Sequence, residues 1–84
     1  MQRTAYNYKL LRSIVEWMNR ADKHGGNYEE YLDMIEAGYM SLNEVLQSID
    51  RILTVWRNIE INSGNKDKAD AITEEKTKLL LLFE

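Results

Sequence analysis

Residues 41–61 read SLNEVLQSIDRILTVWRNIEI and carry the strongest structural signal in the chain. Ser41 and Glu44 form a capping box, in which the two side chains bind free N–H groups at a helix start. Met40 and Val45 occupy the positions of the accompanying hydrophobic staple. The apolar residues that recur every three or four positions are Leu42, Val45, Leu46, Ile49, Ile52, Leu53, Trp56 and Ile59. This spacing predicts a long amphipathic helix that buries one face.

Two further helices are expected before this one. Residues 3–23 spread apolar side chains over an arc of roughly 180°, wide enough to pack against more than one neighbour. The sequence His24-Gly25-Gly26 then supplies a common helix stop. Residues 28–37 form a short helix, with Asn27 as its expected N-cap and Gly38 as its end.

The last expected helix covers residues 66–83 and ends in a run of leucines. Its apolar face is predicted to consist of Ala69, Ile72, Leu79, Leu80 and Phe83. At 100° per residue, Leu81 and Leu82 fall outside this face, so we expect them to be exposed. Exposed leucines at this place favour a partner contact, or a homodimer through the C-terminal helix. The alternative is that the last turn unwinds and folds these side chains back onto the first helix.

Length and composition limit the architecture. The chain has 84 residues, no proline and four glycines, which favours a few long elements with short connections. The predicted fold is all-α: a small helical bundle of three long helices plus one short helix, forming one domain over residues 1–84. The longest apolar run, residues 79–83, is far shorter than the roughly 20 residues of a membrane span. No secretory signal is visible and cysteine is absent, so a cytoplasmic location is expected.

No catalytic residue, metal site or cofactor is expected. Cysteine is absent and His24 is the one histidine, so nucleophiles lack a base and metals lack ligands. The nearest carboxylates, on Asp22, Glu29 and Glu30, do not form a known ligand spacing with His24. A basic residue in the last turn of a helix has a sufficient structural role there. An enzyme is therefore disfavoured.

Nucleic-acid binding is the alternative function. The basic residues of the first helix are Arg3, Lys9, Arg12, Arg20 and Lys23. The formal net charge of −3 argues against general binding to nucleic acid, which usually needs a basic face. A helix-turn-helix centred on Gly38 would place Asp33 and Glu44 where small or apolar residues must hold the two helices together. Binding to nucleic acid is therefore the less favoured prediction.

Acidic residues and tyrosines gather around the short helix. Residues 25–40 contain four acidic and no basic residues. Three tyrosines lie in the same stretch, and tyrosine is enriched in protein interfaces. The candidate partner-binding residues are Tyr28, Glu29, Tyr31 and Tyr39 in this region, and Leu81 and Leu82 near the C-terminus. The competing interpretation is a solvated face with scattered tyrosines.

A short pattern between the second and third expected helices resembles a known module. The stretch Leu32-x-x-Ile35-x-x-Gly38-x-x-Ser41-x-x-Glu44 is similar to the helix–glycine–capped-helix pattern of SHOCT-type short oligomerisation modules. The similarity covers 13 residues, and the general rules for ending one helix and starting the next produce the same pattern. The pattern therefore assigns no family.

Together these features favour a non-catalytic function. We expect a small adaptor, regulator or inhibitor that acts by docking on another protein, the identity of which the sequence does not reveal. Accessory proteins of phages and mobile elements form one class of this kind. A nucleic-acid-binding regulator that uses the basic side of the first helix is the alternative.

Overall fold

The protein folds into four α-helices and has no strand among the residues that the structure describes. A computed structural model describes residues 5–22 and 26–83. The helices are α1 (Ala5–Ala21), α2 (Glu29–Ala37), α3 (Leu42–Asn62) and α4 (Lys66–Leu80). The predicted all-α fold of three long helices and one short helix is confirmed. None of the described helices is long and apolar enough to cross a bilayer.

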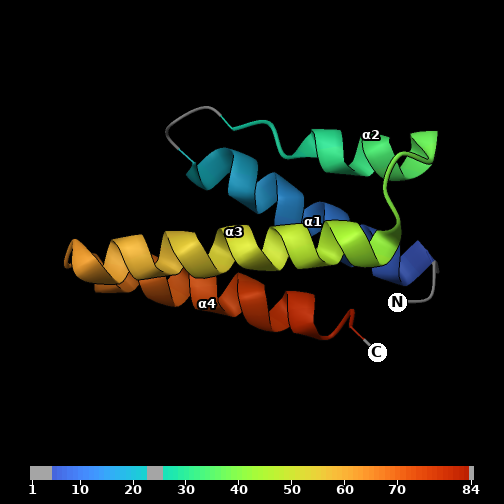
Figure 1. Ribbon diagram of the computed structural model, residues 1–84. Helices are drawn as coiled ribbons and strands as arrows, with labels where there is room; N and C mark the ends of the chain where they lie inside the picture. The colour runs from blue at the N-terminus through green and yellow to red at the C-terminus, as the bar shows by residue number, and fades with distance from the viewer. Residues whose placement is uncertain (1–4, 23–25, 84) are drawn as a thin grey trace.

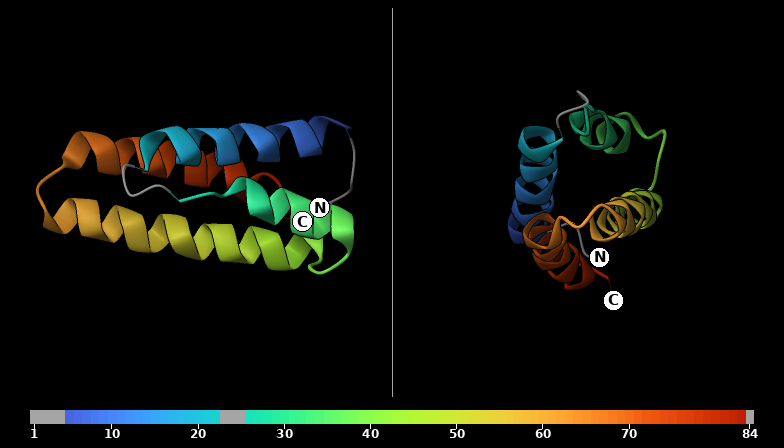
Figure 2. Two further views of the ribbon diagram at one scale, coloured as in Figure 1. Left: turned by 90° about the horizontal axis from the view of Figure 1, so that it is seen from above. Right: turned by 90° about the vertical axis from the view of Figure 1, so that its left-hand side faces the viewer.

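The helices form an antiparallel four-helix bundle. Successive helices run in opposite directions, with α2 above α3 and α4 below it in the view of Figure 1. Each helix contacts the next along the chain, and α4 also contacts α1, which closes a ring around the core (Figure 2). The α3–α4 contact is the most extensive and the α2–α3 contact is the smallest. The α2–α3 seam is therefore the least filled side of the bundle.

Local signals set most helix ends. The Ser41 hydroxyl accepts a hydrogen bond from the Glu44 backbone N–H at 3.2 Å, as the capping box predicts. Gly38 ends α2 with a positive φ of 80°, a conformation that glycine adopts without steric cost. The prediction that Asn27 caps α2 is wrong. Tyr28 occupies the cap position, and its backbone N–H donates to the Asn19 side chain of α1 at 2.8 Å.

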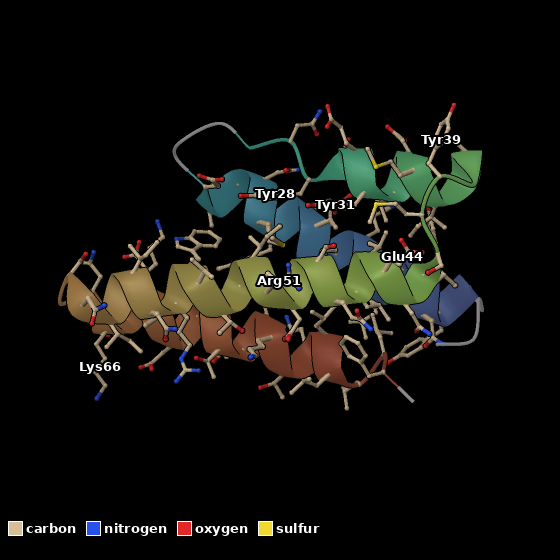
Figure 3. All side chains as sticks on the ribbon, in the orientation of Figure 1. Tyr28, Tyr31, Tyr39, Glu44, Arg51 and Lys66 are labelled. Carbon is tan, nitrogen blue, oxygen red and sulfur yellow. The ribbon has the colours of Figure 1, made fainter. Side chains whose placement is uncertain are left out.

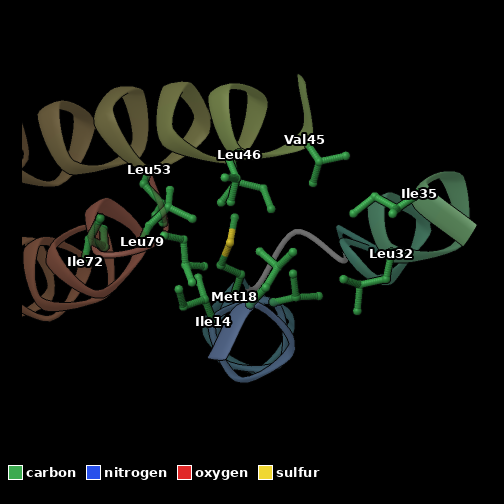
Figure 4. Packing of buried hydrophobic residues seen from close by; sticks show 13 residues of the cluster. Ile14, Met18, Leu32, Ile35, Val45, Leu46, Leu53, Ile72 and Leu79 are labelled. Atoms are coloured by element: carbon green, nitrogen blue, oxygen red, sulfur yellow. The ribbon is translucent and has the colours of Figure 1, made fainter. Parts of the chain in front are cut away.

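The core consists of apolar side chains from all four helices. Figure 4 shows the side chains of Ile14 and Met18 from α1 converging with those of the other helices. Leu11, Ile14, Val15, Met18, Leu32, Ile35, Val45, Leu46, Ile49, Leu53, Ile72, Leu79 and Leu82 make up this buried cluster. The wide apolar arc predicted for the first helix is explained by its position, because α1 packs against both α2 and α4.

The C-terminal end of the bundle differs from the prediction. Leu82 is only 2% exposed, whereas Leu80 is 52% and Leu81 is 74% exposed. The backbone N–H groups of residues 81–83 bond to carbonyls three residues back, as in a 3₁₀ turn, including Leu82 to Leu79 at 2.9 Å. In a 3₁₀ turn residues three apart lie on the same side, so Leu82 follows Leu79 into the core. The placements of Leu82 outside the core and of Leu80 on the buried face are therefore wrong.

Polar side chains of α3 and α4 lie beside the core. Lys76 donates a hydrogen bond to the Thr54 hydroxyl at 2.7 Å, and its ammonium lies 3.5 Å from the Asp50 carboxylate. Glu75 is buried, and its carboxylate accepts a hydrogen bond from Lys78 at 3.2 Å. These contacts place charged groups at the edge of the α4 apolar face, beside the core.

Candidate functional site

The candidate site arises from the difference in length between α2 and α3. α2 has nine residues and α3 has 21. At 1.5 Å per residue, α2 spans about 14 Å and α3 about 32 Å. Figure 1 shows that α2 lies over the first half of α3. The C-terminal part of α3, about 18 Å long, therefore has no α2 residue beside it.

The first hollow lies along this second half of α3. Its volume is about 410 Å³. It is lined by Asp22, Tyr28, Arg51, Ile52, Val55, Trp56 and Ile59. Val55 and Ile59, one helical turn apart, are 53% and 55% exposed, so together they form an exposed apolar patch. The apolar wall of this hollow is therefore open to a ligand.

The second hollow continues from the first between α2 and α3. Its volume is about 450 Å³. It is lined by Asn27, Tyr28, Glu30, Tyr31, Met34, Met40 and Ser48. Tyr28 lines both hollows, so they adjoin at this side chain, and we call the two together the α2/α3 cleft. Figure 3 shows Tyr28 and Tyr31 between the two helices and Arg51 on the facing stretch of α3.

A third hollow extends past Trp56 and Ile59 to the turn between α3 and α4. Its volume is about 720 Å³. Beyond Asp22, Trp56 and Ile59, its lining is mainly polar: Glu60, Gly64, Asn65, Lys66, Asp67 and Lys68. The apolar α2/α3 cleft therefore gives way at this end to a surface of mixed charge.

Trp56 is held in position by two contacts with other helices. Its ring packs against that of Trp17 in α1, with centroids 5.6 Å apart and a tilt of 40°. The Lys68 ammonium of α4 lies 5.4 Å from the Trp56 ring centroid and donates a hydrogen bond to the Ala21 carbonyl at 3.2 Å. These contacts hold in place a ring that also lines the cleft.

Tyr28 is fixed at the centre of the cleft. Its hydroxyl donates a 2.5 Å hydrogen bond to the Asp22 carboxylate. Gly26 lies against this pair, since a Cβ at that position would be 2.7 Å from Asp22 Oδ2 and 2.8 Å from the Tyr28 ring. Burial, together with the smaller effect of the hydrogen bond to the Asp22 carboxylate, raises the pKa of Tyr28 to about 12. The phenol is therefore a neutral donor at physiological pH.

Replacing Tyr28 with phenylalanine is expected to lower the free energy of unfolding by about 1–2 kcal/mol at pH 7, because the hydrogen bond from the Tyr28 hydroxyl to the Asp22 carboxylate is lost. Since the folded state binds the Tyr28 proton more tightly, this contribution is complete below pH 10 and is lost as the pH rises through about 12. Urea denaturation from pH 7 to pH 12 measures both effects. Tyr39→Phe, at an 83% exposed position, is the control. Equal alkaline losses in the native protein and Tyr28→Phe would contradict the assignment.

The structure brings some of the predicted partner-binding residues together and separates others. Tyr28 and Tyr31 line the α2/α3 cleft, and Glu29 is exposed beside them at the start of α2. Tyr39 points away from the bundle beyond the end of α2 (Figure 3). Leu81 is exposed just after the end of α4, outside the hollows described above. Of the six predicted partner-binding residues, Tyr28 and Tyr31 therefore line the cleft.

The α3 side of the α2/α3 cleft is not among the predicted partner-binding residues. Val55 was absent from the predicted apolar face, and Ile59 was assigned to it but is exposed. A signal was present, because Val55 extends the apolar arc of this helix to about 180°. An arc of that width predicts a second contact surface, as it does for α1.

No metal-binding cluster of histidine or acidic side chains is present in the part of the chain that the structure describes.

The basic side of α1 is exposed. It carries Lys9, Arg12 and Arg20, and the Arg12 guanidinium lies 5.6 Å from the Tyr8 ring. Glu16 is exposed between Arg12 and Arg20, which interrupts the basic side of the helix. Arg3, Lys23 and His24 lie outside the described residues. Among the described residues, the α2/α3 cleft is therefore the strongest candidate for a functional site.

Comparison of the chain with protein-family models, curated proteins and solved structures finds no match. The function is therefore inferred from the geometry and chemistry of the α2/α3 cleft.

Proposed function

We propose that this protein is a non-catalytic binding module that docks on another protein through the α2/α3 cleft. The observation that carries the proposal is the uncovered apolar wall of α3, formed by Ile52, Val55, Trp56 and Ile59. Exposed apolar side chains that line a hollow gain more from a partner than scattered ones do, because the partner removes them from water together. An adaptor, a regulator or an inhibitor would work in this way.

The residue types of the cleft support protein docking in particular. Interfaces are enriched in tryptophan, tyrosine, methionine and arginine, and the cleft contains all four types. Trp56 and Tyr28 are already held by contacts within the protein, so binding would order them at little entropic cost. The absence of cysteine fits a reducing compartment, so we place this activity in the cytoplasm.

A matched pair of variants tests the proposal. The cleft variant Val55→Gln, Ile59→Gln changes residues that are 53% and 55% exposed. The control Ile61→Gln, Leu80→Gln changes residues that are 49% and 52% exposed and lie outside the hollows. Both variants are neutral in charge and should remain folded, since all four side chains already contact water.

Polypeptides selected from a display library on the folded native protein should bind the control normally. We expect them to bind the cleft variant at least about tenfold more weakly, the effect of removing central apolar contacts. Hydrogen exchange should show protection of residues 52–59 in the complex. Recovery of no ligand, or of ligands that bind the cleft variant as tightly as the native protein, would contradict the proposal. Retardation of duplex DNA by the native protein at about 150 mM salt would instead favour the nucleic-acid alternative.

A further inference from the structure

We infer that the occupant of the α2/α3 cleft is an amphipathic helix with basic residues beside its apolar face. This inference rests on the proposed function and names the chemistry of the partner. Two independent features support it: the helical spacing of the apolar wall, and the charge of the half of the molecule that surrounds the cleft.

The spacing of the apolar wall fits a helix. Ile52, Val55, Trp56 and Ile59 are related as i, i+3, i+4 and i+7, so they form one ridge along α3. Such a ridge packs into the groove between two ridges of a second helix, as in helix-in-groove recognition. The part of α3 without an α2 neighbour is about 18 Å long, the length of a helix of about 12 residues. The partner helix would thus lie along α3, beside residues 26–28, which lead into α2 (Figure 2).

The charge around the cleft favours a basic partner. Residues 26–62, which contain α2 and α3, hold seven acidic and two basic residues. α2 itself has four exposed carboxylates and no basic residue, and its Glu30 lines the cleft. These carboxylates lie at the α2 end of the cleft, whereas the hollow beyond Trp56 and Ile59 is of mixed charge. Lysine or arginine on the part of the partner that faces α2 would therefore meet complementary charge. Among the described residues, Arg51 is the one cation that lines the cleft. Reversing its charge should therefore have the opposite effect on binding from reversing the charge of Glu30.

Three synthetic peptides of about 14 residues test the inference directly. All three have leucine at i, i+3, i+4 and i+7 in an alanine background, and they carry lysine, glutamine or glutamate beside the leucine face. The lysine peptide should bind the native protein at least about tenfold more tightly than the glutamate peptide, with the glutamine peptide between them. The difference should shrink at about 1 M salt, where the Debye length is about 3 Å.

Two charge-reversal variants of exposed cleft residues provide the internal check. Glu30→Lys should weaken binding of the lysine peptide and strengthen binding of the glutamate peptide. Arg51→Glu should have the opposite effect on both peptides. Both variants should fold normally, as circular dichroism would show, because both side chains are exposed.

The outcomes separate this inference from the proposed function. Equal binding of the three peptides, lost in the Val55→Gln, Ile59→Gln variant, would overturn the basic character of the partner and leave cleft docking intact. Failure of all three peptides, while display ligands still require the cleft, would overturn the helical occupant. Display ligands that do not require the cleft would overturn both. A dimer that sedimentation detects in the native protein, and that the cleft variant abolishes, would show a second copy as the occupant and overturn the inference.

Discussion

Leu82→Glu is expected to lower the free energy of unfolding by about 3–5 kcal/mol, the usual cost of an unpaired charge in a core. Leu82 is 2% exposed and belongs to the main apolar cluster. Small domains have only about 5–15 kcal/mol of stability, so this variant should be largely unfolded or melt far below the native protein. Urea denaturation followed by circular dichroism measures the loss.

The adjacent position supplies the control for this prediction. Leu81→Glu should change the free energy of unfolding by less than about 0.5 kcal/mol, because Leu81 is 74% exposed. The two substitutions are chemically identical and one residue apart. The difference between their losses of unfolding free energy therefore shows which of the two side chains points into the core. Similar losses in both variants would show that the last turn does not place Leu82 in the core.

Ile49→Ala is expected to lower the free energy of unfolding by about 2–5 kcal/mol, through lost burial and the cavity that remains. Ile49 lies in α3 and is fully buried in the cluster that all four helices share. The cost should fall in the upper part of this range if neighbouring side chains cannot move into the space.

A position on the same helix serves as the comparison. Ile61→Ala should cost less than about 0.5 kcal/mol, because Ile61 is 49% exposed. Chemical denaturation of both variants under the same conditions gives the comparison. A small cost for Ile49→Ala would mean that the bundle packs around a different face of α3.

The sequence by itself predicted the features that depend on neighbouring residues. The capping box at Ser41, the left-handed glycine at position 38 and the 3–4 spacing of α3 are local, since each involves residues within one or two helical turns. The all-α fold follows from these signals, and so does the acidic, tyrosine-containing short helix that forms one side of the cleft.

The tertiary structure decided what depends on distant parts of the chain. The Asn19 side chain of α1 accepts a hydrogen bond from the backbone N–H of Tyr28, the residue before α2. The local capping rule, which considers Asn27, does not predict this contact. The change to 3₁₀ bonds after Leu80 rotates Leu82 into the core, and a strict 100° per residue misses it. Which side of α3 stays uncovered depends on where α2 lies across it. Periodicity identifies the apolar faces of a helix, but the packing of the other helices determines which of them remain open.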